Sequence, residues 1–408
     1  MVGDRRDFAS ALCSGGTRVE KKSAVAAVGT AAFAQTGRGA PPRGLGCKYF
    51  AMRVSDPTPA AELARSARRR GCQACMSRPP LHFCPSRLTS RQCPLWVITC
   101  YFNPCNYQSR RRNFQKFARG LAAQRVPLLT VQLRTADDQP SLPAELSTLM
   151  VDTVSSDVLW AKEKLLNLAL EHLPTSCTQV CWCDCDILFE RPTWARDCSR
   201  LLEAHRVLQP FASAVFLGPA ETPDKHQTYQ PNTSFACAYA GRPGGRFADP
   251  ALYEAHPGYC WAARRDVLER MGGLYDRGVV GHGDLVMALA FSHRSDRDGP
   301  LPDRWHGVWQ PQWSEALLRD ARRWQQHAAT VVQGDIGCVP GTIYHLWHGN
   351  KRDRRYHQRA QLLHDFDPDC HLADDDGLWR WTDAAHRANL PNRLKAYFAN
   401  RNEDDAKA

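Results

Sequence analysis

Three short apolar segments separated by two helical patterns constrain the fold of this chain most strongly. LWVITCYF (95–102), VPLLTVQL (126–133) and VCWCDCDILF (180–189) are rich in β-branched, aromatic and Cys residues, as buried strands are. Residues 114–122 and 159–173 carry apolar side chains three and four positions apart, which is the helical period. Strand, helix, strand, helix and strand in this order predict an α/β fold, with three layers and a mostly parallel central sheet.

The chain beyond residue 190 carries weaker signals. Segments 215–217, 234–239 and 342–347 favour short strands, and the GG pair at 272–273 closes a short helix at 266–271. Residues 294–312 are dense in Arg, Asp, Pro and Trp, and we expect a loop there.

The positive charge of the chain is confined to its first quarter. The net charge is +11, and residues 1–93 alone contain 16 Lys and Arg against 5 Asp and Glu. The rest of the chain contains 37 residues of each sign, so nucleic acid is not an expected partner of the folded part. We expect residues 1–93 to form a disordered basic leader, 94–360 the folded domain and 361–408 a polar C-terminal extension.

Hydropathy and cysteine content bear on the compartment. The sequence has no run of about 18 apolar residues and no apolar segment followed by a small-residue cleavage site at its start. We therefore expect no membrane span and a cytoplasmic location. The 17 cysteines are odd in number and often lie in apolar runs, which favours reduced, buried thiols. Cys72 and Cys75, with Cys84 and Cys93, leave a zinc site in the leader as an alternative.

Asp184 and Asp186 stand at the carboxyl end of the third expected strand. Ligands of parallel α/β sheets bind beyond the carboxyl ends of the strands, and alternation along a strand aims both carboxylates to one side. Charges beside a buried strand cost several kcal/mol unless they are neutralised. A divalent cation, Mn²⁺ or Mg²⁺, would neutralise them and leave coordination places for phosphates. Two acids facing water at the strand end are the alternative.

Two further clusters carry chemistry. Asp284, in GHGD (281–284), opens a helical pattern, where it is either a helix cap or a general base for an acceptor hydroxyl. In HLWHGNK (345–351), His345 lies in the last expected strand and His348 directly follows it, and His345 is a candidate third metal ligand.

In this order the clusters resemble glycosyltransferases of the GT-A fold, whose Rossmann-like domain binds a metal through an Asp-x-Asp motif. The resemblance covers about residues 95–360 and includes a galactosyltransferase-type segment. It is carried by VCWCDCDILF, GYCWAARR (258–265), MGGLYD (271–276), GHGD and HLWHGNK. GHGD is followed by Leu285, where the family often has a second acid.

The resemblance implies a hexosyltransferase-like enzyme that uses Mn²⁺ or Mg²⁺, a nucleotide-diphosphate sugar and a glycan, lipid or protein acceptor. It implies that Asp184, Asp186 and His345 bind the metal and that Asp284 is the catalytic base. The residues expected to bind substrates are Asn103, Lys162, Trp261, Gly281, Gly283, His348 and Lys351.

Two other functions remain open from the sequence. A phosphohydrolase of the haloacid-dehalogenase type also places Asp-x-Asp after a strand, but it favours Thr or Val where this chain has Leu188, and it places the motif on its first strand. A non-catalytic carbohydrate-binding protein, or a protein that binds nucleic acid through the basic leader, is the second alternative.

Overall fold

The computed structural model describes residues 81–83 (backbone only), 94–135, 141–227, 231–241, 255–294, 298, 313–356 and 358–404. The chain divides into two compact units, Met1–Gly71 and Cys72–Ala408, and every described residue belongs to the second. Most of the expected leader, its zinc alternative and most of the loop expected at 294–312 therefore lie outside the described residues.

The central sheet has eight strands: β1 (Leu81–Phe83), β2 (Leu95–Phe102), β3 (Leu128–Arg134), β4 (Leu149–Val154), β5 (Gln179–Cys183), β7 (Val207–Gln209), β10 (Cys260–Arg264) and β11 (Ile336–Cys338). Their order is β1-β4-β3-β2-β5-β10-β7-β11. The neighbouring strands β4, β3, β2 and β5 run parallel, β11 is parallel to β7, and β10 and β1 are antiparallel to their neighbours. The predicted α/β fold with a mostly parallel sheet is confirmed.

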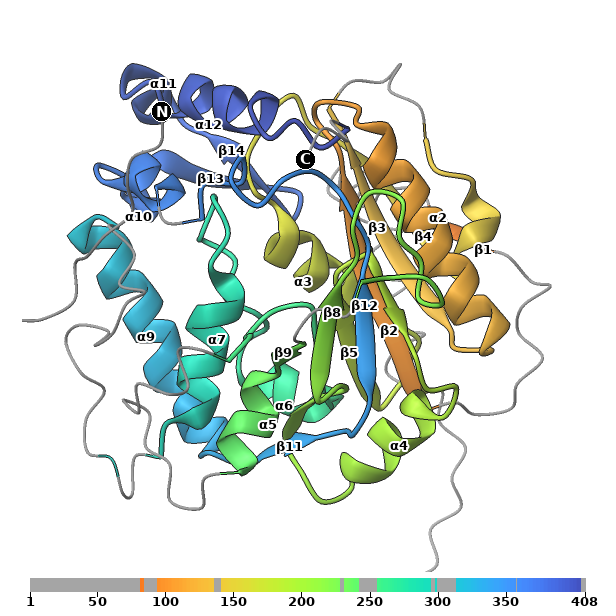
Figure 1. The fold of residues 1–408 in the computed structure, drawn as a ribbon. Helices are drawn as coiled ribbons and strands as arrows, with labels where there is room; N and C mark the ends of the chain where they lie inside the picture. The colour runs from red at the N-terminus through yellow and green to blue at the C-terminus, as the bar shows by residue number, and fades with distance from the viewer. Residues whose placement is uncertain are drawn as a thin grey trace, which may run out of the picture. The chain divides into compact units, whose positions relative to one another are not determined.

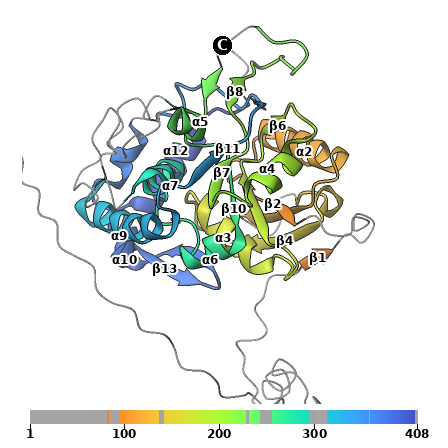
Figure 2. The same ribbon diagram turned by 90° about the horizontal axis from the view of Figure 1, so that it is seen from below.

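Helices cover both faces of this sheet. They are α2 (Gln108–Ala123), α3 (Lys162–His172), α4 (Trp194–Leu201), α5 (Phe235–Ala240), α6 (Arg265–Arg270), α7 (Gly283–Ser292) and α9 (Glu315–Val332), with the 3₁₀ helices η3 (Ala144–Leu146) and η5 (Arg359–Leu363). Figure 2 shows α2 and α4 on one side of the central strands and α7 and α9 on the other.

Alternation along β2 divides the core into two layers. Trp96 and Ile98 pack into the cluster that contains α3, α7 and α9, whereas Leu95 and Val97 pack into the cluster that contains α2 and α4. Because successive side chains of a strand point to opposite faces, a strand with every residue buried requires cover on both faces. All eight residues of β2 are buried, so the three layers follow from this strand.

A second sheet brings a distant segment to the end of β5. It contains β6 (Ile187–Phe189), β12 (Thr342–His345), β8 (Ser213–Phe216) and β9 (Asn232–Thr233), in the order β6-β12-β8-β9. β12 is antiparallel to β6, with His345 opposite Ile187. This register places His345 beside Asp186, although about 160 residues of chain separate them in sequence.

The strand predicted at 234–239 is wrong. The structure has the helix α5 at Phe235–Ala240, preceded by the short strand β9. Ser234 caps this helix, because its side chain accepts a hydrogen bond from the backbone N–H of Cys237. A Ser cap satisfies a donor at the helix start, and the helix buries Phe235 and Ala236.

The C-terminal part of the described chain packs as α10 (Pro368–His371), β13 (Leu372–Asp375), β14 (Leu378–Trp381), α11 (Asp383–Arg387) and α12 (Leu390–Ala399). Figure 1 shows α11 and α12 adjoining, with β13 and β14 nearby. Leu390, Leu394 and Phe398 of α12 are buried in the same core cluster as α3 and α7. No helix of the described residues is long and apolar enough to cross a bilayer.

Candidate active site

The backbone of the turn between β5 and β6 is fixed by hydrogen bonds on several sides. The hydroxyl of Thr99 donates to the carbonyl of Cys183 at 2.7 Å, and the N–H of Asp184 donates to the carbonyl of Tyr259, also at 2.7 Å. The carbonyl of Asp186 accepts from the N–H of Leu346 at 2.8 Å. The turn therefore holds its two carboxylates in place at the carboxyl end of β5.

Asp186, His345 and His348 converge into one group. The Nε2 atom of His348 lies 3.0 Å from Oδ2 of Asp186, and Nε2 of His345 lies 3.7 Å from Oδ1 of Asp186. The two Nε2 atoms are 3.2 Å apart. One ligand atom from each residue lies within 4.8 Å of the others, and this is the group of described residues that could hold a metal ion.

The donor set fits a divalent transition metal. Oδ1 of Asp186 is buried and makes no hydrogen bond with any described residue. Burial lowers the pKa of the His345 imidazole well below its usual value, although Asp186 acts in the opposite direction. A neutral imidazole offers a lone pair, and two imidazoles with one carboxylate suit ions such as Mn²⁺ or Fe²⁺. The carboxylate oxygens and imidazole nitrogens of this group all offer lone pairs. A bound proton or a cation is therefore needed to hold them this close together.

Asp184 belongs to a different arrangement. Its Oδ1 lies 2.7 Å from Nζ of Lys162, the first residue of α3, and the same Nζ lies 3.0 Å from Oδ1 of Asp284. Burial acts to lower the pKa of Lys162, but Asp184 and Asp284 raise it well above its usual value. Burial raises the pKa of Asp184 to about 7, opposed by Lys162. Asp184 thus pairs with a cationic side chain and lies outside the group formed by Asp186 and the histidines.

Both arrangements line one pocket with an empty volume of about 860 Å³, part of it open to solvent. Arg354 and Arg359 add positive charge to the lining, and Tyr259 and Phe216 add aromatic surface. The Tyr259 hydroxyl is buried and has no hydrogen-bond partner among the described residues, so it is available to a ligand.

Two expected substrate-binding residues are held by other contacts. Asn103 is buried: its amide N–H donates to the Tyr107 carbonyl at 2.8 Å, and its Oδ1 accepts from the Tyr107 N–H at 2.9 Å. Trp261 is fully buried, and its indole N–H donates to the carbonyl of Pro257 at 2.7 Å. Neither residue lines the pocket. Asn103 shapes the turn after β2, and Trp261 is a core residue.

Gly281, Gly283 and Lys351 lie beside the pocket but do not line it. A Cβ atom on Gly281 would lie 2.9 Å from the guanidinium of Arg359, and one on Gly283 would lie 2.4 Å from Oε1 of Glu163. These glycines therefore permit close packing. The ammonium group of Lys351 lies 3.5 Å from the ring centroid of Phe216, which lines the pocket.

Several lining residues gave no specific signal in the sequence. Arg354 belongs to a basic run at 351–355 that indicates charge but no partner. Tyr259 has a left-handed φ of 73°, which no sequence pattern indicates for a Tyr. Arg401 lines the pocket from a segment close to the C-terminus, and Glu403, two residues further on, lies against His348.

No protein-family model and no curated protein matches this sequence. Solved structures resemble it weakly. The catalytic domain of Drosophila beta1,4galactosyltransferase 7 in complex with xylobiose is 13% identical, over 48% of this chain and 59% of that chain, with a TM-score of 0.26. S. aureus TarS 1-349 in complex with UDP-GlcNAc is 12% identical, over 48% and 53%, with a TM-score of 0.30.

A putative nucleotide-diphospho-sugar transferase from Desulfovibrio desulfuricans G20 is 10% identical, over 74% of this chain and 96% of that chain, with a TM-score of 0.28. This chain spans between 53% and 59% of the other two proteins. At such TM-scores the likeness adds no detail about the residues or substrates of this chain.

Proposed function

We propose that the protein is a metal-dependent glycosyltransferase that moves a sugar from a nucleotide-diphosphate donor to an acceptor hydroxyl. The observation that carries the proposal is one pocket that combines two arrangements. The Asp186, His345 and His348 group offers three metal ligands, and Lys162 joins Asp184 to Asp284. The low-identity structures described above include a galactosyltransferase and are compatible with this proposal.

Asp186, His345 and His348 would hold the metal, which supplies Lewis-acid stabilisation to the leaving diphosphate when it is bound. Breaking a sugar–phosphate bond leaves negative charge on the diphosphate, and fixed cations that face it lower the barrier. Arg354 and Arg359 line the pocket and can supply this charge. Both side chains are buried, so little reorientation is needed as the charge develops.

Asp284 is the proposed general base. It stands in the first turn of α7, lines the pocket, and accepts hydrogen bonds from Nζ of Lys162 at 3.0 and 3.1 Å. An ionised carboxylate at a pocket wall can accept the proton of an attacking hydroxyl. Lys162 thereby orients Asp284 and also pairs with Asp184. In this proposal Asp184 takes no part in holding the metal.

The first experiment is a comparison of the wild-type chain with Asp186→Asn. Wild-type protein is screened for thermal stabilisation by nucleotide-diphosphate sugars with Mn²⁺, because a ligand that binds the folded state raises its melting temperature. The stabilising donor is then used in a transfer assay. We expect Asp186→Asn to lose Mn²⁺-dependent transfer by on the order of 10² or more, because metal stabilisation contributes several kcal/mol.

The matched control is Asp266→Asn. Asp266 is an exposed aspartate on α6 that pairs with Arg264 and Arg270, and it is not among the pocket-lining residues. Its substitution removes the same charge and should leave transfer unchanged. Full Mn²⁺-dependent transfer by Asp186→Asn would refute the proposed metal site. Phosphate release from simple phosphomonoesters without sugar transfer would favour the phosphohydrolase alternative.

A further inference from the structure

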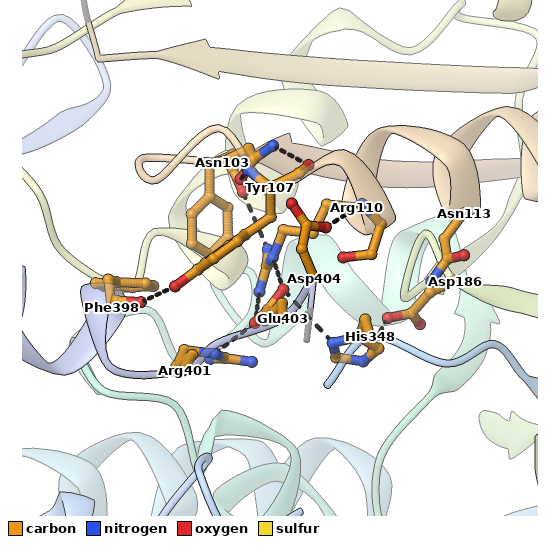
Figure 3. Close-up of polar contacts among 12 residues, drawn as sticks. Asn103, Tyr107, Arg110, Asn113, Asp186, His348, Phe398, Arg401, Glu403 and Asp404 are labelled. Carbon is orange, nitrogen blue, oxygen red and sulfur yellow. Dashed lines mark hydrogen bonds and ion pairs between the residues drawn. The ribbon is translucent and has the colours of Figure 1, made fainter. Parts of the chain in front are cut away.

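A C-terminal segment, residues 401–404, lies against the loop that carries His348 (Figure 3). Gly349, which follows His348, has a left-handed φ of 90°. A Cβ atom there would lie 2.9 Å from the Cα of Glu403 and 3.1 Å from the carbonyl oxygen of Asn402. Both the backbone angle and the close approach require glycine. The segment and the loop therefore meet backbone to backbone.

Glu403 is the buried centre of this contact, with 0% of its surface exposed. Arg110 binds its carboxylate with two nitrogen atoms, Nη2 at 3.0 Å from Oε1 and Nε at a short distance from Oε2. Arg401 adds Nε at 2.5 Å from Oε1. A buried carboxylate costs several kcal/mol unless it is paired, and these two guanidinium groups pair it and fix its position.

The remaining side of the carboxylate faces a metal-ligand candidate. Oε2 of Glu403 lies 3.6 Å from Nδ1 of His348, while Nε2 of the same ring lies 3.0 Å from Oδ2 of Asp186. Without an ion, the nearer carboxylate is that of Asp186 at Nε2. An ion bound at Nε2 uses the lone pair of that atom, so the ring proton must then lie on Nδ1, the nitrogen that faces Glu403. Outer carboxylates that orient ligating histidines in this way tune metal affinity.

We propose that Glu403 is a positioning residue of the metal site: it holds the Nδ1–H tautomer and the ring orientation of His348, so that Nε2 is free to bind the ion. This inference rests on the metal site of the proposed function. It assigns a role to a residue about 220 positions after Asp186 in the chain, from a segment in which the sequence shows only polar residues.

The segment has anchors that do not depend on Glu403. Both carboxylate oxygens of Asp404 accept backbone N–H bonds at the start of α2, from Gln108 at 2.8 Å and Ser109 at 2.6 Å. The hydroxyl of Tyr107 donates to the carbonyls of Phe398 and Ala399 at the end of α12. Asp404 points at α2 and Glu403 points at His348 (Figure 3). Glu403 and Asp404 are neighbouring acids with different partners, so substitutions at the two positions can serve as test and control.

The test compares Glu403→Gln with Asp404→Asn in the full chain. Each change removes one negative charge and little volume. Free Mn²⁺ is measured by electron paramagnetic resonance during titration of folded protein. We expect Glu403→Gln to weaken Mn²⁺ binding by about 10–100-fold, the usual effect of losing an outer-shell partner. Asp404→Asn should lower the melting temperature and leave the Mn²⁺ affinity unchanged.

A second measurement needs no folded Glu403 variant. Wild-type protein with ¹⁵N-labelled histidine reports the tautomer of His348, assigned by its absence in His348→Gln. In the presence of Zn²⁺, a diamagnetic ion that also suits imidazole ligands, we expect a protonated Nδ1 and a metal-bound Nε2, and a proton on Nε2 under these conditions would overturn the inference. So would equal Mn²⁺ affinities of Glu403→Gln and wild type, or equal losses in both variants. Wild-type protein that binds no Mn²⁺ would overturn the metal site itself and the inference with it.

Discussion

At the scale of single residues, His256 shows how local geometry sets a charge state in the pocket. Its Nδ1 accepts a hydrogen bond from the N–H of Gly258 at 3.1 Å, and its ring stacks on Tyr259 with centroids 4.0 Å apart. Protonation of Nδ1 would remove that acceptor. Burial lowers the pKa of His256 from 6.5 to about 4, although Asp284 acts in the opposite direction. The folded protein therefore holds this ring neutral.

The depressed pKa predicts an acid-sensitive contribution to stability. An unfolded His binds a proton below about pH 6.5, whereas the folded one resists until about pH 4. Stability present above pH 6.5 is therefore lost as the pH falls from 6.5 towards 4. We expect urea denaturation to show that wild type loses about 1–2 kcal/mol more between pH 7 and pH 5 than His256→Asn.

Asn is a suitable replacement because its side-chain oxygen can accept the same N–H bond two residues on. The control is His386→Asn, which removes an exposed histidine and should leave the pH dependence of wild type intact. Parallel stability curves for wild type and His256→Asn would contradict the neutral state assigned to the folded His256.

At the scale of elements, the parts that local pattern defines were predictable. β2, β3 and β5 read from the sequence as apolar strands, and α3 follows from the spacing of Leu165, Leu166 and Ala169, because burial on one face imposes a period. α5 was mistaken for a strand because its apolar run has no period of either kind, and only the Ser234 cap and its packing decide between the two.

The site divides in the same way. The approach of His345 to Asp186 was predictable because both residues belong to the ends of expected strands, whereas His348 was expected to bind substrate and Asp184 to bind the metal. Trp261 was expected to contact the substrate, but its side chain points from β10 into the core. The sequence motif does not indicate which face of the sheet this residue occupies. Glu403 depends on tertiary contacts alone, and no local pattern could indicate it.

The contact between α3 and α7 yields a prediction at the same scale. Gly283 opens α7, and a Cβ there would lie 2.4 Å from Oε1 and 2.6 Å from Cδ of Glu163 in α3. Only 3% of the Glu163 surface is exposed, so its side chain has little space into which to move. Gly283→Ala should therefore destabilise the fold by about 1–3 kcal/mol through overpacking, although Ala favours a helix more than Gly does.

Urea denaturation of the single and double variants measures this contact. In a Glu163→Ala background the obstructing side chain is absent, and Gly283→Ala should become neutral or stabilising, giving a coupling energy of about 1–3 kcal/mol. Equal effects of Gly283→Ala in both backgrounds would show that Glu163 is not what excludes a side chain at this position.

At the scale of the whole molecule, the proposed site depends on segments spread along the described chain. Asp186 comes just after β5 in the central sheet, His348 comes after β12 of the second sheet, and Glu403 comes after α12. Such contacts form only when segments that lie far apart in the sequence have come together in the folded chain. The same arrangement explains why residues 401–404, which look like a polar tail, contain an acid with no exposed surface.

The uneven charge of the chain leads to a prediction about Met1–Gly71. These residues form a unit apart from Cys72–Ala408, and they contain 13 Lys and Arg against 5 Asp and Glu. All the residues of the proposed site lie in the second unit. A chain that begins at Cys72 should therefore bind Mn²⁺ within about twofold of wild type, because a site whose contacts are intact keeps its binding free energy.

The deletion ends at Gly71 and not at Cys93, because β1 (Leu81–Phe83) pairs with β4 at the edge of the central sheet. Sugar transfer and Mn²⁺ binding are measured for both chains. Their retention on a cation-exchange column is measured as the salt concentration rises. A glycosyltransferase keeps transfer and loses only the salt-dependent retention that basic residues confer. If the shortened chain folds and binds Mn²⁺ but all activity is lost, the function depends on the basic leader, as the nucleic-acid alternative requires.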